Sequence, residues 1–322
     1  MLGLAIACGK GPVDPTPTGP PSLTCPADIS ISAVVGGMQS VTYTTPVATG
    51  GAAPVTTTCA PSSGTPFQTG ATTVNCTATD AQNRQATCSF SVTLQPLLLN
   101  VHRFVAFGDS VTAGEDGRRL QIRPAFIDPA KSYPAVLQSM MMLDFPDQGV
   151  FVANEGHGGV RATDDARNLA GILQSYRAEA LLLLHGYNDL LNDGLRAVDP
   201  VAFALRDDIR IAHGQGVQYV FLSTITPSRP ASGRFNRTID PRAIQETNAR
   251  LVQIASSERA VLVNTFDAFR GREMELVEED GLHPTVMGSQ VIAETFYAAI
   301  REAGLTTGFR QLPTSNYQLP RR

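Results

Sequence analysis

The stretch that decides the fold is Val105-Ala106-Phe107-Gly108-Asp109-Ser110-Val111-Thr112-Ala113-Gly114-Glu115. Its apolar beginning is typical of a buried strand, and Gly108 ends that run just before Asp109 and Ser110. Glycine tolerates the sharp turn that follows a strand, so we expect the turn to present an exposed serine. A serine in this position can act as a nucleophile if a base lies within hydrogen-bond reach.

Downstream of this turn, apolar runs alternate with helical patterns. Strands are predicted at residues 104–107, 150–153, 181–185, 219–223 and 261–263. Helices are predicted near residues 133–142, 164–175, 201–212, 241–256 and 287–303. Continuously apolar strands separated by helices favour a parallel sheet that is covered on both faces. A site in such a sheet lies at the carboxyl ends of the strands, which is where Ser110, Gly159 and Asn188 are expected.

Three further polar segments follow in order. They are Asn154-Glu155-Gly156-His157-Gly158-Gly159, His185-Gly186-Tyr187-Asn188-Asp189 and Asp280-Gly281-Leu282-His283-Pro284-Thr285. Together with the turn at Ser110, these blocks resemble the SGNH/GDSL hydrolase family over roughly residues 103–306. The resemblance implies an α/β domain at 101–307 with a three-layer flavodoxin-like parallel sheet of five strands, and the activity of an ester hydrolase.

The residue types fit that chemistry. His283 can take and return a proton near neutral pH, and Asp280 can accept the other ring N–H and fix its tautomer. The residues therefore predict a catalytic triad of Ser110, His283 and Asp280. The resemblance implies an oxyanion hole formed by the backbone N–H groups of Ser110 and Gly159 and the side-chain amide of Asn188. Glycine leaves room for the substrate carbonyl, and a neutral amide donates without titrating.

Several other classes of function lack support. No histidine lies in a metal-ligand spacing, no nucleotide-binding glycine motif is complete, and there is no G-x-S-x-G elbow. We therefore expect no metal and no cofactor. The net charge of -4 with dispersed basic residues gives no nucleic-acid footprint. The predicted hydrolase region contains no cysteine, which excludes a thiol mechanism there. His157 and His185 lie within the blocks and are candidates for the lining of the pocket.

The first third of the chain differs in composition. Residues 24–95 are rich in Thr, Ser, Val, Ala and Gly, and their period-two patterning predicts a small all-β sandwich. The clearest hairpin joins 73–78 to 87–94 across 80–84. The segments at Cys25-Pro26, Gly50-Gly51, Cys59-Ala60-Pro61 and Cys76-Thr77-Ala78 resemble a hyalin repeat (HYR) module, and this resemblance implies an all-β immunoglobulin-like sandwich.

Cysteine use indicates an exported protein. Four of the five cysteines lie in the β module, which suggests two disulfides and an oxidising compartment, with three pairings open: Cys25, Cys59, Cys76 and Cys88. The fifth, Cys8, follows Leu4-Ala5-Ile6-Ala7 and resembles a bacterial lipoprotein lipidation site. Residues 1–23 then form a signal remnant and a Pro-rich tether to a membrane, and residues 308–322 an irregular tail.

We therefore expect a secreted or lipid-anchored serine esterase, with a slight preference for short-acyl esters of carbohydrates. A lipase, lysophospholipase or thioesterase of the same family remains an alternative, with a lipid or thioester as substrate. A third possibility is a surface adhesion protein in which the β module contacts a polymer or protein and the hydrolase scaffold is inactive. The acyl length and alcohol moiety are open at this stage.

Overall fold

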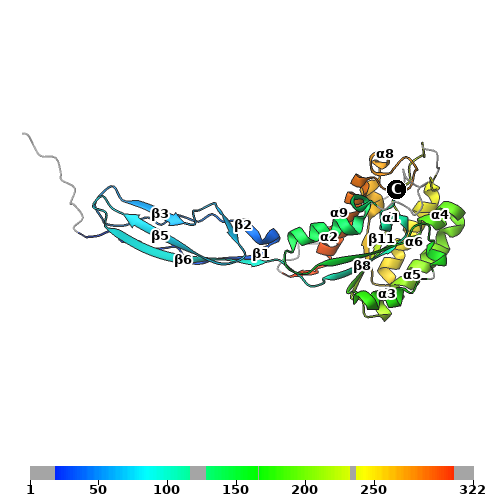
Figure 1. Ribbon diagram of the computed structural model, residues 1–322, viewed down its shortest axis with the longest axis horizontal. Coiled ribbons are helices and arrows are strands. Elements are labelled where there is room, and N and C mark those ends of the chain that lie inside the picture. Colours follow the sequence, from blue (N-terminus) through cyan, green and yellow to red (C-terminus); the bar gives the residue numbers. More distant parts are fainter. Residues whose placement is uncertain (1–18, 117–127, 166, 233–236, 308–322) are drawn as a thin grey trace, which may run out of the picture. The chain divides into compact units, whose positions relative to one another are not determined.

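The computed structural model describes residues 19–116, 128–165, 167–232 and 237–307 (Figure 1). Cys8, most of the predicted tether and the predicted tail lie outside the described residues. The chain divides into two compact units, Met1–Pro96 and Leu97–Arg322. Within the described ranges, no helix is long and apolar enough to cross a membrane.

The first unit is built from β-strands. Its main sheet has the order β1-β6-β5-β3, formed by β1 (Ile29–Val34), β6 (Gln85–Pro96), β5 (Gly70–Thr79) and β3 (Thr56–Ala60). β1 runs parallel to β6, and the other two pairs are antiparallel. A short turn of helix, η1 (Val35–Gly37), leads to β2 (Met38–Ser40), which pairs with β4 (Pro66–Gln68). The predicted hairpin is the long β5–β6 pair, and the all-β fold is confirmed.

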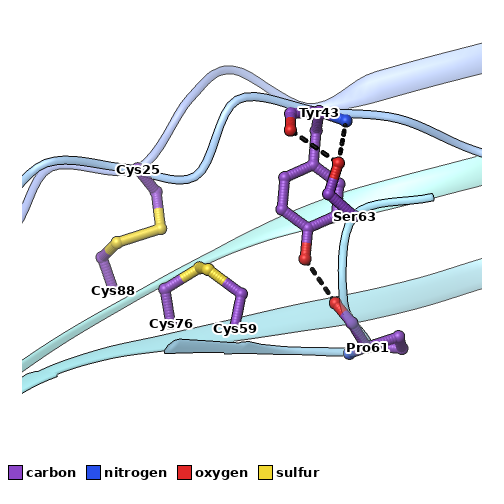
Figure 2. The surroundings of a disulfide bond; sticks show 7 residues. All are labelled: Cys25, Tyr43, Cys59, Pro61, Ser63, Cys76 and Cys88. Atoms are coloured by element: carbon purple, nitrogen blue, oxygen red, sulfur yellow. Dashed lines mark hydrogen bonds between the residues drawn. A yellow bond between two sulfur atoms is a disulfide. The ribbon is translucent and has the colours of Figure 1, made fainter. Parts of the chain in front are cut away.

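Alternation along β5 and β6 creates the core of this unit. Every second side chain is buried, and these residues join others from the facing segments: Val74, Cys76, Phe90, Val92, Leu94, Val34, Val41 and Phe67. Two disulfides lie beside this core, Cys25–Cys88 and Cys59–Cys76 (Figure 2). The second joins residues directly opposite each other on β3 and β5.

Tyr43 holds two segments of the first unit together. Its hydroxyl donates to the carbonyl of Pro61 (Figure 2). Ser63 Oγ accepts from the backbone N–H of Tyr43 (2.8 Å) and donates to the backbone carbonyl of Tyr43 (2.7 Å). The ring also packs edge-on against Phe90, with centroids 5.0 Å apart. Through these contacts, the segment before β3 is fixed to the loop after it.

The second unit contains a five-stranded parallel sheet of order β12-β11-β10-β8-β9. Its strands are β8 (Arg103–Gly108), β9 (Phe151–Gly156), β10 (Ala180–Leu184), β11 (Tyr219–Ser223) and β12 (Val261–Val263). Counted along the chain this is the order 2-1-3-4-5, which is flavodoxin-like, so the predicted fold class is confirmed. The order reverses between β8 and β10, and ligands of such sheets bind outside the carboxyl ends of the strands at this switch point.

Helices cover both faces of the sheet (Figure 1). α2 packs against α9, and α5 packs against α3 and α6. The long helices are α2 (Tyr133–Asp144), α3 (Leu169–Tyr176), α5 (Val198–Gly214), α6 (Pro241–Ser257) and α9 (Val286–Glu302). Shorter elements are α1 (Ser110–Ala113), α4 (Tyr187–Asp193), α7 (Thr265–Phe269), α8 (Glu273–Leu276), η3 (Pro129–Lys131), η4 (Ala162–Asp164) and η5 (Gly194–Ala197), with β7 (Leu98–Leu99) paired to β13 (Thr306–Thr307). All five residues of β10 are buried, as expected for a central strand between two helical layers.

Candidate active site

Ser110 begins α1 directly after β8. Asp109 caps this helix, since its Oδ1 accepts from the backbone N–H of Val111 at 3.1 Å. The turn requires glycine at 108, because a Cβ there would lie 2.0 Å from the carbonyl oxygen of Leu184 on β10. Ser110 is only 2% exposed, so the expectation of an exposed serine was wrong. The side chain of His283, itself fully buried, contacts its hydroxyl and contributes to this burial.

A continuous hydrogen-bonded chain runs from Ser110 through His283 to Asp280. Ser110 Oγ lies 2.9 Å from His283 Nε2, and His283 Nδ1 lies 2.5 Å from Asp280 Oδ2. The other carboxylate oxygen of Asp280 accepts from the backbone N–H groups of Leu282 (3.0 Å) and His283 (3.1 Å). Burial opposes ionisation of Asp280, but these hydrogen bonds, above all that from the imidazole, hold its pKa below the usual value. A carboxylate in this place keeps the ring proton on Nδ1 and leaves Nε2 to face the serine.

The second and third blocks lie against the nucleophile turn. The backbone N–H of His157 donates to the carbonyl of Gly108 at 2.9 Å, and Asn188 Nδ2 donates to the carbonyl of Val160 at 2.8 Å. An amide carries two N–H bonds, so the contact with Val160 uses one of them. Gly159 has a φ of +77°, and a Cβ built there would meet no atom within 4 Å. The predicted donors at 110, 159 and 188 are therefore on segments that are hydrogen-bonded to one another.

Asp189 fixes the chain that follows Gly159. Its Oδ2 accepts from the backbone N–H of Ala162 at 2.8 Å, and its Oδ1 accepts from the backbone N–H (3.1 Å) and hydroxyl (2.6 Å) of Thr163. The carboxylate is fully buried. Through it, α4, which carries Asn188, is bonded to η4, which follows the glycine block.

A buried ionic network under the nucleophile turn was not predicted from the sequence. His185 is 1% exposed, with Nε2 3.2 Å from Asp165 Oδ2 and Nδ1 3.4 Å from Asp109 Oδ2. Burial alone would lower the pKa of His185, but the two carboxylates raise it to about 9. Asp165 is in turn paired with Arg167. Burial opposes the ionisation of Asp165, but the hydrogen bonds from Arg167 and His185 outweigh it and hold the pKa of Asp165 well below its usual value.

Arg167 connects this network to two strand ends. Its guanidinium donates to the carbonyl of Gly108 at the end of β8 (3.1 Å) and to that of Glu155 on β9 (2.6 Å), and it lies 4.2 Å from the ring centroid of Phe107. Arginine suits this position because its planar fork satisfies several acceptors at once. His157, by contrast, is exposed, and contacts the turn through its backbone.

Among the residues that the structure describes, no group of three or more His, Cys, Asp or Glu side chains is arranged so that it could hold a metal ion. The contacts described above bring together a nucleophilic hydroxyl, a base with its orienting carboxylate, and neighbouring N–H donors. This combination is suited to acyl transfer.

Comparison with known proteins agrees with these features. The model of the GDSL-like lipase/acylhydrolase family matches residues 106–291, more than half of the chain, and the HYR domain model matches residues 16–94. No curated protein matches the chain.

Solved structures similar to this chain include proteins described as esterases and a lipase/acylhydrolase. A lipase/acylhydrolase from Enterococcus faecalis is 19% identical, with a TM-score of 0.50, covering 65% of this chain and 99% of that one. A putative arylesterase from Agrobacterium tumefaciens is 17% identical, with a TM-score of 0.50, covering 62% and 98%. An acetyl xylan esterase from Geobacillus stearothermophilus is 20% identical, with a TM-score of 0.49, covering 63% and 96%. At these identities the likeness to the two structures with a TM-score of 0.50 concerns the fold alone.

Proposed function

The chain belongs to the GDSL-like lipase/acylhydrolase family, and from this premise we propose that it is an exported serine esterase that uses Ser110, His283 and Asp280. The observation that carries the proposal is the unbroken chain of contacts from Ser110 Oγ to His283 Nε2 (2.9 Å) and from Nδ1 to Asp280 (2.5 Å). Serine becomes a nucleophile near neutral pH when a base is this close.

The geometry supports the following course of the proposed reaction. His283 Nε2 takes the proton as Ser110 Oγ bonds to the ester carbonyl carbon, and the imidazolium is stabilised by Asp280. The carbonyl oxygen becomes an oxyanion, which the N–H groups of Ser110, Gly159 and Asn188 would stabilise. His283 then returns the proton to the departing alkoxide as the carbon–oxygen bond breaks. Water repeats the sequence on the acyl-enzyme and releases the acid.

For the substrate, we propose a short-acyl ester of a carbohydrate polymer. The HYR domain in the same chain supports this, because a second module beside a catalytic domain can hold it against a surface or polymer. The chain contains no tryptophan, so stacking on a sugar would fall to tyrosine or phenylalanine. Lipid esters and thioesters are the competing substrates of the same chemistry.

The export proposal rests on the two disulfides and the HYR domain. Disulfides persist in oxidising compartments, so the protein is expected to work outside the cytoplasm. We extend this to a lipid anchor at Cys8. Labelling of producing cells with an alkyne fatty acid would transfer the label to the wild-type protein and not to a Cys8→Ser variant. Equal labelling of both would refute the anchor at this residue.

The test of the activity is hydrolysis of p-nitrophenyl esters, from acetyl to long acyl chains, by wild type and Ser110→Ala. Loss of the nucleophile is expected to lower kcat by about 10^4 or more. Ser139→Ala is the matched control and should retain full activity, because within the described ranges the Ser139 hydroxyl donates only to the α2 backbone at Ala135. Turnover confined to acetyl would support a deacetylase, and a preference for long chains would transfer the proposal to lipids.

Normal turnover by folded Ser110→Ala would overturn the triad. Absence of turnover by wild type on every ester would instead favour the adhesion alternative. A pull-down that uses the whole chain, including residues 23–96, as bait would then test it.

A further inference from the structure

A buried lysine joins two carboxylates beside the candidate active site. Lys131, at the end of η3, is 1% exposed, and its Nζ lies 2.9 Å from Asp116 Oδ1 and 2.5 Å from Glu278 Oε1. A lysine is seldom buried unless it is paired, and the ion pairs here compensate its charge. The three residues, which we call the Lys131 cluster, play no part in the proposed chemistry.

The two carboxylates come from the two segments that must meet for that chemistry. Asp116 lies two residues after Gly114, whose backbone N–H closes α1 on the carbonyl of Ser110. Glu278 lies at the base of the other segment, since its backbone N–H donates to the carbonyl of His283 at 2.7 Å and its carbonyl accepts from Gly281 at 3.0 Å. The Lys131 cluster thus links the segment that begins with the nucleophile to the loop that carries the base.

The lysine itself is held by separate contacts. Its carbonyl accepts from Ser289 Oγ on α9 at 2.7 Å. The next residue, Ser132, receives a hydrogen bond from Asn154 Nδ2 at 2.9 Å, and the same amide donates to Ala113 at 3.2 Å. Because η3 is anchored to α9, β9 and α1, the ammonium group is a fixed point for both carboxylates.

Stability alone gives no sufficient reason for such a cluster. Replacing a whole buried ion pair by neutral groups is often neutral or stabilising, whereas removing one partner strands a buried charge. What the ionic contacts add is a directional link between segments far apart in the sequence.

We propose that Lys131 is a positioning residue that keeps Ser110 Oγ and His283 Nε2 at reacting distance. The inference rests on the proposed function of the Ser110 and His283 pair. A misplacement of about 1 Å at a reacting centre can cost about 100-fold in rate. Loosening the loop should therefore lower kcat by 10-fold to 100-fold and leave KM within about two-fold, since the substrate still binds.

The test separates positioning from stability. Lys131→Met removes the ammonium group that pairs with both carboxylates and should lower both Tm and kcat. The triple variant Lys131→Met/Asp116→Asn/Glu278→Gln removes all three charges with little change of shape at the two acidic positions, so its Tm should recover toward wild type while kcat stays low. Leu251→Ala, in the buried face of α6, serves as a control that lowers Tm without touching the cluster. It should keep the wild-type kcat when it is assayed at a temperature well below its Tm.

A second measurement does not need turnover. Phenylmethanesulfonyl fluoride labels a serine that is activated by its base, and mass spectrometry follows the rate. Labelling of Ser110 should slow by 10-fold or more in the triple variant and in Glu278→Gln, which serves if Lys131→Met does not fold. The positioning role would be overturned if the triple variant is labelled and turns over at the wild-type rates. It would also be overturned if Leu251→Ala loses kcat in the same proportion to its loss of Tm as the Lys131 variants. Failure of wild type itself to be labelled or to turn over would count against the proposed function instead.

Discussion

The carboxylate of Asp109 accepts a hydrogen bond from the backbone N–H of Tyr187 at 3.2 Å. Both residues are buried, and they belong to the turns that follow β8 and β10. The contact spans the switch point of the sheet, so the turn that carries Ser110 is set directly against the helix that carries Asn188. Asp109 thus acts on the site by holding two turns together.

This contact predicts the effect of Asp109→Asn. The amide keeps one oxygen for the cap on Val111 but opposes the N–H of Tyr187 with its own N–H group, which leaves a buried donor unsatisfied. The expected cost is about 1–3 kcal/mol of unfolding free energy, with a lower kcat. Urea denaturation and p-nitrophenyl acetate turnover measure the two. Asp240→Asn, at the exposed N-cap of α6, is the control. Equal losses in both variants would contradict a special role for Asp109.

Asn188 should act on the transition state more than on substrate binding. Removing one oxyanion donor typically lowers kcat by about 100-fold to 1000-fold, so Asn188→Ala should show this loss with a nearly unchanged KM. Steady-state kinetics on the best p-nitrophenyl ester provide the comparison. Asn192→Ala is the control, because it lies on the same helix and its amide bonds to the backbone of Asn188. A large rise in KM at constant kcat would mean that Asn188 binds the ground state instead.

Two glycines of the second block should respond differently to alanine. A Cβ at Gly156 would lie 2.1 Å from the backbone nitrogen of Ala113, whereas a Cβ at Gly159 would enter open space. Gly156→Ala should therefore destabilise the fold strongly by forcing α1 away from β9. Gly159→Ala should cost about 1–2 kcal/mol through its positive φ and reduce activity by crowding the substrate carbonyl. Thermal unfolding and kinetics of both variants would be compared. A stable, fully active Gly156→Ala would contradict the close approach.

The sequence predicted the sheet, the helices and the four blocks because each depends on local pattern. Apolar runs such as 181–184 define strands, and Ser110, Gly159, Asn188 and His283 follow recognisable turns. His185 was singled out only as a candidate for the pocket lining, and the contacts of Lys131, Arg167 and His185 could not be found in this way. The partners of Lys131 are 15 and 147 residues away, and those of His185 are 20 and 76 away. Such pairs become visible only when the strands are assembled.

The disulfide pairing had the same limitation. Spacing alone leaves three pairings of four cysteines open, and the choice depends on strand register. Cys76 lies opposite both Cys59 on β3 and Cys88 on β6, so even the register offers two partners. The structure joins it to Cys59, and Cys88 pairs with Cys25 from the segment before β1.

The raised pKa of His185 predicts that the free energy of unfolding falls as the pH rises. Its pKa in the folded protein, about 9, lies above the value of about 6.5 for an unfolded chain. The stabilisation from its charge is therefore complete below about pH 6.5 and is lost as the pH rises through about 9. Burial raises the pKa of Asp208 to about 7, so Asp208 titrates mainly at a lower pH than His185. Unfolding free energy from urea denaturation should fall between about pH 7.5 and 9.5.

The matched variants isolate this contribution. His185→Asn has no imidazole to titrate, so its stability should be lower at pH 7.5 and should vary less across the same range. His213→Asn, in the last turn of α5, should keep the wild-type slope. A wild-type slope in His185→Asn would assign the pH dependence to other groups.

The two disulfides should contribute unequally to the first unit. A disulfide restricts the unfolded chain more when it closes a longer loop, and the sequence separations are 63 for Cys25–Cys88 and 17 for Cys59–Cys76. The loop-entropy difference is about 1 kcal/mol in favour of the longer loop. Cys25→Ala/Cys88→Ala should therefore lower the Tm of the first unit more than Cys59→Ala/Cys76→Ala, as measured by calorimetry on the full chain. Cys76 is fully buried, so truncating it adds a packing loss that works against the expected order. A larger Tm loss in the Cys25→Ala/Cys88→Ala variant despite that loss would establish loop closure as the dominant effect, and the reverse order would assign the greater share to packing around Cys76.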